Sequence, residues 1–210
     1  MKTEIIFRAL FFILLFGVMA MRIYFARRVR RSGERLLPDQ AAVEREGRFL
    51  FSARVILGIG LAAFLVLYVL NVPWIAALSV PFPGWLRWLG FILGLLSLAS
   101  WTWAQSALGS QWSPQLQLRD EHRLVTSGPY AYVRHPIYTS MCGYFIGLAL
   151  VTANWVFIVL VALTFAGLFA RVPQEEKMMI DRFGDAYREY ARRTGRFVPK
   201  IGRKTAVPWE

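Results

Sequence analysis

The sequence predicts an all-α, polytopic membrane protein with about five transmembrane helices and a C-terminal cytoplasmic helix. Two observations lead to this prediction. Hydrophobic residues make up 56% of the 210-residue chain, more than a water-soluble domain usually contains. The apolar residues also gather in long runs, whereas most basic residues lie in the segments between these runs. A chain of this length suggests one membrane-embedded domain, which we expect to cover residues 1–210.

Five apolar runs are the predicted membrane spans, because about 17 to 25 mainly apolar residues cross a bilayer as a helix. They cover residues 5–25, 55–70, 86–107, 137–151 and 155–170. The last two runs are close to the minimum length. Only Thr152, Ala153 and Asn154 separate them, so we expect a tight helical hairpin.

The first run has a second interpretation as a cleaved signal peptide, since Lys2, Arg8 and an apolar stretch precede small residues around Ala20. The basic segment that follows favours a retained membrane anchor, because clustered arginines resist translocation. These arginines are Arg22, Arg27, Arg28, Arg30, Arg31 and Arg35. Segment 30–52 mixes apolar and charged residues, and we expect an interfacial helix or loop there.

Charge predicts how the spans are oriented. Of the 25 Lys and Arg residues, 21 lie in segments 27–54 and 109–135 or from Arg171 onward, and none lies in connections 71–84 and 152–154. Positive residues favour the cytoplasmic side. We therefore expect the N-terminus outside, with segment 109–135 and the C-terminal tail in the cytoplasm. Three prolines in connection 71–84 predict an irregular outer loop.

The net charge of +12 does not by itself predict nucleic-acid binding. The basic residues flank membrane spans, and attraction to anionic lipid headgroups accounts for them. No metal site is predicted either, because two histidines and one cysteine are a poor ligand set. Cys142 would also lie about two helical turns deeper in the bilayer than His135.

Glycines within the spans predict close helix packing. The pairs Gly90/Gly94 and Gly143/Gly147 have the GxxxG spacing that lets helices approach closely. Residues 58–63 match the letters of a dinucleotide-binding fingerprint, but they lie inside an apolar span instead of a strand-to-helix turn. Close packing is the better interpretation there too.

From Pro173 the pattern changes to that of a water-soluble helix. Proline suits a first helical turn, the acidic Glu175 and Glu176 favour a helix N-terminus, and three arginines precede Gly195. Three aromatic residues recur at helical spacing and predict one packing face: Phe183, Tyr187 and Tyr190. We expect this helix to fold back against a site near the membrane.

The segment GPYAYVRHPIY, residues 128–138, is the most informative part of the sequence. Pro136 disfavours helical geometry at His135 and suits the first position of the fourth span, so we expect the His135 side chain to cap that helix. Polar groups at a membrane edge are unfavourable unless they face a cavity or a partner. A polar helix cap with a snorkelling arginine is the purely structural alternative.

Further polar groups favour a binding site over that alternative. They lie between the third and fourth spans and at the end of the fifth: Gln115, His122, Tyr130, His135, Tyr138, Arg171 and Glu175. Aromatic faces, imidazoles and one acidic group together suit a polar, cationic organic ligand.

These residues occur in motifs that resemble those of the integral-membrane isoprenylcysteine carboxyl methyltransferases and the related phospholipid methyltransferases. In order, the motifs are Gln115-(x6)-His122-Arg-Leu-Val125, Gly128-Pro-Tyr130-(x3)-Arg134-His135-Pro-Ile-Tyr138, Arg171-(x3)-Glu175-Glu176 and Phe183-Gly184-(x2)-Tyr187-(x2)-Tyr190. The resemblance covers about residues 115–199. Residues 1–108 show only generic membrane helices.

The resemblance implies a methyltransferase that uses S-adenosylmethionine, with residues 109–200 as its cofactor-binding and catalytic region. It implies that the cofactor contacts Gln115, His122, Arg123, Leu124, Val125, Tyr130, His135, Pro136, Ile137, Tyr138 and Glu175. It assigns Arg171 to the substrate, and Arg171, Glu175 and His135 to the catalytic group. A lipophilic or lipidated acceptor would enter from the bilayer.

Three other functions stay open. A phospholipid amine N-methyltransferase needs a deprotonated amine, whereas Arg171 favours an anionic carboxylate acceptor. A sterol-reductase-like membrane enzyme with a nicotinamide cofactor shares the Arg-His-Pro-x-Tyr motif, but Ile137 stands where we expect asparagine. A non-catalytic membrane scaffold accounts for the spans and gives the polar residues no shared role. The membrane could be the bacterial inner membrane or the endoplasmic reticulum.

Overall fold

The computed structural model describes residues 2–31, 43–44, 47–109 and 124–200. These residues form helices and two isolated β-bridges, with no sheet among them. The helices are α1 (Lys2–Arg31), α3 (Arg48–Val69), α4 (Pro73–Ala77), α5 (Gly84–Leu108), the 3-10 helix η2 (Gly128–Ala131), α6 (Pro136–Thr152), α7 (Trp155–Phe183) and α8 (Asp185–Arg193).

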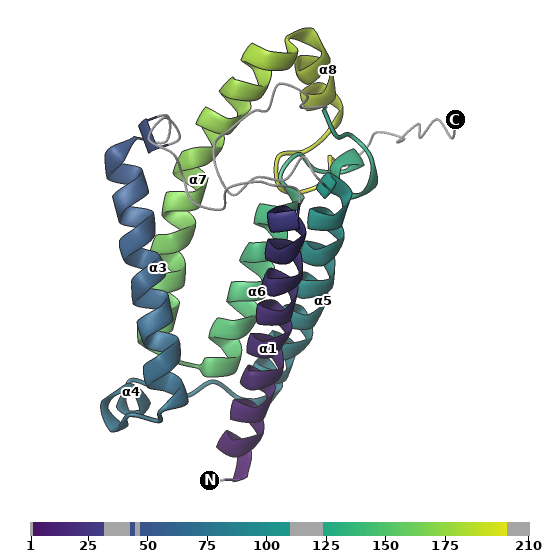
Figure 1. Cartoon of the computed structure of the whole chain (residues 1–210). Helices are drawn as coiled ribbons and strands as arrows, with labels where there is room; N and C mark the ends of the chain where they lie inside the picture. Colours follow the sequence, from purple (N-terminus) through teal and green to yellow (C-terminus); the bar gives the residue numbers. More distant parts are fainter. Residues whose placement is uncertain (1, 32–42, 45–46, 110–123, 201–210) are drawn as a thin grey trace.

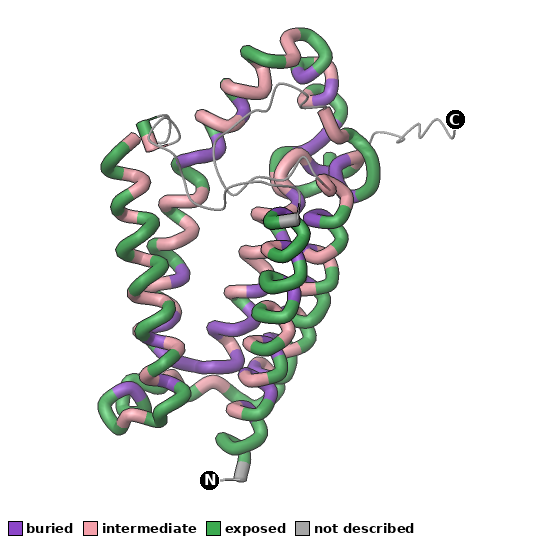
Figure 2. The backbone as a smooth tube through the Cα atoms, in the orientation of Figure 1, coloured by how far each residue is buried: buried purple, intermediate pink, exposed green. Residues whose placement is uncertain are grey.

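The helix lengths confirm the predicted polytopic membrane fold. Four described helices, α1, α3, α5 and α7, are long and apolar enough to cross a membrane, and α6 is a shorter apolar helix of 17 residues. Exposed residues dominate the outward faces of these helices, as lipid contact requires (Figure 2). The predicted irregular connection after α3 contains one short helix, α4, which begins at Pro73.

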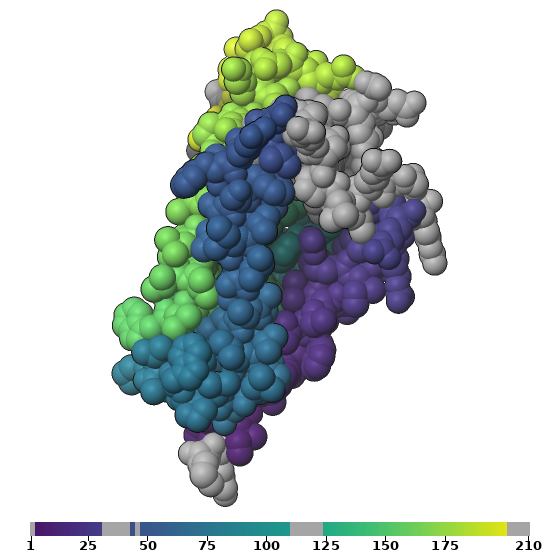
Figure 3. All heavy atoms as spheres, turned by 60° about the vertical axis from the view of Figure 1, so that its left-hand side comes forward, coloured from purple at the N-terminus to yellow at the C-terminus, as the bar shows by residue number. Residues whose placement is uncertain are grey.

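The helices form two groups that meet at one end of the bundle (Figure 1). α1, α5 and α6 pack together, and α3 packs along α7; seen from the side, α3 lies between α7 and α1 (Figure 3). Only Ala153 and Asn154 separate α6 from α7, which confirms the tight hairpin. Asn154 caps α7 by accepting a hydrogen bond from Val156 N at 3.0 Å. From this turn the two helices diverge.

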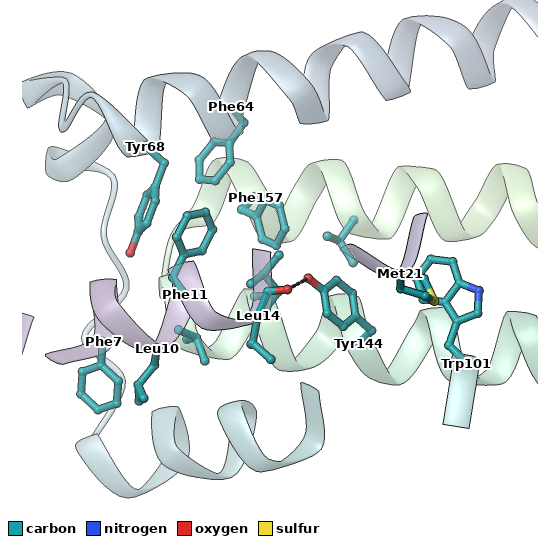
Figure 4. Close-up of a cluster of buried hydrophobic side chains, with 14 of the residues drawn as sticks. Phe7, Leu10, Phe11, Leu14, Met21, Phe64, Tyr68, Trp101, Tyr144 and Phe157 are labelled. Carbon is teal, nitrogen blue, oxygen red and sulfur yellow. Dashed lines mark hydrogen bonds between the residues drawn. The ribbon is translucent and has the colours of Figure 1, made fainter. Parts of the chain in front are cut away.

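An aromatic core joins the two groups (Figure 4). The rings of Phe11 in α1 and Tyr68 in α3 lie 4.7 Å apart between centroids. The buried Tyr144 hydroxyl of α6 donates a hydrogen bond to the carbonyl oxygen of Leu14 in α1 at 3.0 Å. These contacts join α1 to α3 and to α6.

A second set of contacts fastens the end of the bundle that carries the N-terminus. The buried Arg87 of α5 donates to the carbonyl oxygen of Val151 from Nε at 3.1 Å and from Nη2 at 2.8 Å. Its Nη1 lies 2.5 Å from Glu4 Oε1 of α1. These groups lie beside a pocket of about 330 Å³. One arginine thus links α1, α5 and the end of α6.

The glycines of α5 and α6 lie against each other, which confirms the close packing predicted from both GxxxG pairs. A Cβ atom on Gly147 would lie 2.5 Å from Gly90 O and 2.7 Å from Gly94 N. Within residues 58–63 the packing interpretation holds at Gly60, where a Cβ would lie 3.4 Å from Leu160 Cδ2, and is wrong at Gly58 of α3, where no atom of another described element lies within 4 Å of a Cβ. Gly58 is exposed on the outer side of its helix.

We predict that Gly147→Ala destabilises the protein by about 1–3 kcal/mol, because the atoms in the way belong to the α5 backbone and cannot move aside cheaply. Thermal unfolding in detergent micelles measures this change. Gly58→Ala is the matched control, and it should leave the protein unchanged or more stable by up to about 1 kcal/mol. Equal destabilisation by both variants would contradict the packing argument.

α7 continues through Pro173 to Phe183, so the prediction of a separate helix that begins at Pro173 is wrong. A proline inside a helix loses one backbone hydrogen bond, but membrane helices tolerate this where neighbouring contacts compensate. The Arg171–Glu175 ion pair bridges the proline, with Nε and Oε1 2.8 Å apart. The chain breaks instead at Gly184, whose φ of 55° and ψ of −126° favour glycine.

α8 begins after this break and returns toward the bundle (Figure 1). Tyr187 and Tyr190 are buried, which agrees with the predicted packing face. The ends of α1, α5 and α7 and the beginnings of α3 and α6 all lie at the α8 end of the bundle. The polar motifs therefore gather at one end of the membrane helices.

Candidate active site

The chain after α8 returns to the beginning of α6 and runs beside it. We call residues 194–198 the C-terminal strap. Val133 and Gly195 form a parallel β-bridge, and His135 N donates to Arg196 O at 3.1 Å. A Cβ atom on Gly195 would lie 1.7 Å from Val198 O, so only glycine fits this turn. The strap thereby closes one side of the polar cluster.

Glu176 lies at the centre of that cluster. Arg134 Nε donates to Glu176 Oε1 at 3.0 Å, and Arg196 Nη2 donates to Glu176 Oε2 at 2.5 Å. His135 Nε2 lies 3.3 Å from Oε1. The Glu176 side chain is only 12% exposed, so these partners stabilise a carboxylate that burial alone would disfavour. One acidic residue of α7 therefore holds both the beginning of α6 and the C-terminal strap.

Arg134 extends this network to α8. Its Nη1 donates to Ala191 O at 3.0 Å and to Thr194 O at 2.6 Å, at the C-terminal end of that helix. A positive charge is favourable at a helix C-terminus. Arg134 thus connects the beginning of α6, α7 and the end of α8.

Glu175 gathers three of the residues predicted for the site. The Tyr138 hydroxyl donates to Glu175 Oε1, and Arg171 Nε lies 2.8 Å from the same oxygen. His135 Nδ1 lies 3.7 Å from Glu175 Oε2, beyond direct hydrogen-bond distance. His135 and Tyr138 from α6 thus meet Arg171 and Glu175 from α7.

The predicted capping role of the His135 side chain is wrong. His135 occupies the N-cap position of α6, but its ring makes no capping hydrogen bond. The imidazole faces the carboxylates of Glu175 and Glu176 instead. A hydrogen bond to a carboxylate is stronger than one to a neutral backbone group, so the carboxylates compete successfully for the ring. Pro136 is the first residue of α6, as predicted.

Aromatic rings form a wall beside the carboxylates. The rings of His135 and Tyr138 stack at 5.5 Å with an interplanar angle of 6°. Phe197 of the C-terminal strap lies 5.8 Å from the His135 ring and 5.0 Å from the ring of Phe169 in α7. This wall offers π-faces close to negative charge, a combination that favours an organic cation.

The buried tyrosines at this end are neutral phenols. The Tyr190 hydroxyl donates to the carbonyl oxygen of Tyr130 in η2 at 2.7 Å. Burial, followed by the nearby Tyr190 and Glu175, raises the pKa of Tyr130 above its usual range. Burial and the negative charge of Glu176 raise the pKa of Tyr187 to about 12. These phenols stay protonated at neutral pH and are poor general bases.

The other predicted site residues lie further from the carboxylates or outside the described residues. Leu124 and Val125 are half-buried in the segment before η2. Ile137 packs against the hydrophobic core. Gln115, His122 and Arg123 lie outside the described residues.

Four residues of the cluster had no predicted role in the site. Arg134 and Glu176 are adjacent to predicted site residues and carry opposite charges, so the sequence offered a signal for their pairing. Arg196 and Phe197 gave no such signal, because only the return of the strap brings them to the site. Within the described residues, no group of three or more His, Cys, Asp or Glu side chains could hold a metal ion.

Part of this chain is similar to known proteins. The model of the Isoprenylcysteine carboxyl methyltransferase (ICMT) family matches residues 88–181. Protein-S-isoprenylcysteine O-methyltransferase of Schizosaccharomyces pombe is 35% identical over 82 residues, which cover 39% of this chain and 35% of that protein. The human protein of the same name is 39% identical over 88 residues, which cover 41% of this chain and 31% of that protein.

The relatives also include proteins with another name. The cobalt-zinc-cadmium resistance protein CzcN of Cupriavidus metallidurans is 31% identical over 118 residues, which cover 56% of this chain and 52% of that protein. The chain thus spans between about a third and a half of the relatives compared, from 31% to 52% of their length.

A solved structure extends the likeness to the fold. The eukaryotic intramembrane Ras methyltransferase ICMT matches with a TM-score of 0.50 and 26% identity, over 70% of this chain and 52% of that one. The matched residues 88–181 contain η2, α6 and the part of α7 that carries Arg171, Glu175 and Glu176. On this sequence and structural evidence, the chain is similar to the isoprenylcysteine carboxyl methyltransferase family over residues 88–181.

Proposed function

We propose that this protein is an S-adenosylmethionine-dependent methyltransferase that acts on the carboxylate of a lipophilic acceptor. The observation that supports this proposal most is the convergence of His135, Tyr138, Arg171 and Glu175 at one end of the membrane helices. These residues come from two segments about forty positions apart, and the similarity of residues 88–181 to the family supports a common function for them.

The chemistry of these residues fits the cofactor, which carries a sulfonium cation, an amino group and an adenosine. Glu175 offers a partly exposed carboxylate, and His135, Tyr138 and Phe197 offer aromatic faces. Within the described residues, the buried Gln174 Oε1 beside Glu175 has no hydrogen-bond partner, which leaves an acceptor for a ligand. We propose that Glu175, Tyr138, His135 and Tyr130 hold the cofactor.

The acceptor would be oriented by Arg171. The bound cofactor supplies an electrophilic methyl group, and the remaining requirement on the protein is alignment of the attacking oxygen. A guanidinium matches carboxylate geometry, and Arg171 forms an ion pair with Glu175, with Nε and Oε1 2.8 Å apart. Arg171 would therefore position an anionic acceptor.

A carboxylate acceptor also agrees with the protonation of the site. It is already ionised at neutral pH and needs no general base. An ammonium acceptor would need one; the phenols of Tyr130 and Tyr187 stay protonated and arginines pair with Glu175 and Glu176, so that role would fall to His135. Carboxyl methylation is therefore favoured over amine methylation.

The membrane setting completes the proposal. We propose that the end of the bundle with η2 and α8 faces the cytoplasm, because most basic residues lie there. The chain would form one domain, residues 1–210, in which residues 109–200 bind the cofactor. The lipophilic acceptor would enter from the bilayer. Several similar proteins are named for an isoprenylcysteine, which makes a prenylated cysteine the first acceptor to test.

Calorimetry of the purified protein in detergent tests the function, with S-adenosylmethionine and NADPH as separate ligands. We expect S-adenosylmethionine to bind and Glu175→Ala to weaken it by about 10- to 100-fold, as loss of a charged partner does. Glu189→Ala is the control, since Glu189 pairs with Arg192 and Arg193 on α8, away from Glu175. Binding of NADPH alone would support a reductase, and binding of neither ligand would support a scaffold.

A further inference from the structure

Gln105, near the end of α5, is a buried amide that the protein leaves without a partner. Its side chain is 1% exposed. Within the described residues, neither Nε2 nor Oε1 of Gln105 has a hydrogen-bond partner. Nearby polar groups of α5 are paired: Thr102 donates to Leu98 O at 2.8 Å, and Ser100 accepts from Ser140 at 2.9 Å. Gln105 is therefore an exception on its own helix.

The Gln105 side chain points into the helix bundle, at the end that carries the candidate site. It follows Trp101 by four residues and lies on the same helix face. Trp101 packs against Tyr144 of α6, with ring centroids 6.1 Å apart, and belongs to the same buried cluster as Met21 of α1 (Figure 4). Gln105 thus faces the interior between α1 and α6, one turn nearer to the site.

The same end of α5 contacts η2. A Cβ atom on Gly128 would lie 3.6 Å from Ala107 Cβ, two residues after Gln105. η2 also carries Tyr130, and α6 begins at Pro136 shortly after it. Gln105 therefore lies at the level where the membrane interior meets the proposed site.

A buried amide without partners is unfavourable, because it loses its hydrogen bonds to water and gains none. Methionine has a similar length and would fill the same space without this penalty. Unpaired buried groups in native proteins commonly have a catalytic or binding role, or pair with a water or an ion. The donor and the acceptor of Gln105 together need a partner that offers both.

We propose that Gln105 binds a ligand of the site through both atoms of its amide, a role that rests on the proposed function. The ligand group must present a donor beside an acceptor. Two groups of the proposed reaction do so: the adenine base of the methyl donor, which glutamine pairs with through two hydrogen bonds, and an N-acylated prenylcysteine, whose amide N–H lies beside a carboxylate oxygen. Gln105 then confers specificity for one of them.

The test compares Gln105→Met with the wild-type protein in detergent. Thermal unfolding without ligand should give a midpoint that is unchanged or higher. Affinity for S-adenosylhomocysteine and for N-acetyl-S-farnesylcysteine is measured separately. We expect one of the two to bind about tenfold more weakly to the variant, which corresponds to the loss of one or two hydrogen bonds. The ligand that is affected identifies the partner of Gln105.

Thr102→Val is the matched control, because it removes a polar group from the same helix whose hydrogen bond stays within that helix. It should leave both affinities unchanged. Equal affinities of wild type and Gln105→Met for both ligands would overturn the role of Gln105 while leaving the function intact. A lower midpoint with unchanged affinities would show a structural hydrogen bond instead. A wild-type protein that binds neither ligand would overturn both proposals.

Discussion

Replacing Glu176 by glutamine should destabilise the protein by about 2–3 kcal/mol, because the change leaves Arg134 without its charged partner. Breaking a fully buried ion pair costs about 3–5 kcal/mol. The expected value is lower here since the Arg196 side chain is 49% exposed and water can reach this partner. Arg134 is only 10% exposed and suffers the larger loss. Thermal unfolding in detergent micelles measures the effect.

Two comparisons make this prediction specific. Glu189→Gln removes a carboxylate that also pairs with two arginines, but this side chain on α8 is 40% exposed. The midpoint of thermal unfolding of Glu189→Gln should therefore stay close to that of the wild type. Arg134→Gln should cost much less in the Glu176→Gln background than alone, because the two residues act as a pair. Similar midpoints for Glu176→Gln and Glu189→Gln would refute the central role of Glu176.

Arg171→Lys should reduce kcat/KM for a carboxylate acceptor by about 10- to 100-fold, the value of a charged hydrogen bond with good geometry. Lysine keeps the positive charge beside Glu175 but lacks the planar guanidinium group, whose two N–H donors match the two oxygens of a carboxylate. Affinity for S-adenosylhomocysteine should change by less than about threefold, because Glu175 keeps a charged partner. Activity with N-acetyl-S-farnesylcysteine and calorimetry give the two quantities.

Lys177→Gln is the control for Arg171, since it removes a positive charge from an exposed position of the same helix. It should leave both quantities near their wild-type values. A parallel loss of cofactor affinity and turnover in Arg171→Lys would mean that Arg171 serves the cofactor. An unchanged kcat/KM would remove it from the site.

The sequence allowed the fold class to be predicted because a bilayer permits few solutions. Backbone groups in lipid must pair within their own segment, so each long apolar run is a helix. Charge at the ends of the runs also predicted which ends lie together, and Pro136 marked the first residue of α6. The proximity of His135, Tyr138, Arg171 and Glu175 was predictable because their motifs resemble those of a known family.

Local rules failed where distant contacts decide the structure. Pro173 has the features of a helix start, yet α7 continues through it because a neighbouring ion pair and packing outweigh one lost hydrogen bond. Gly58 and Gly147 look alike in sequence, but only Gly147 has a facing helix. Helix propensity and spacing contain no information about which partner stands opposite.

The sequence by itself determined the membrane helices, their approximate ends and the residue types of the site, since these follow from apolar length, charge and motif. Only the tertiary structure decided that Glu176 holds Arg134, His135 and Arg196 together, that Phe197 reaches the site, and that Gln105 is buried without a partner. The physical reason is that pairing and burial depend on atoms far away in the chain, which Gly184 and the strap turn at Gly195 bring into contact.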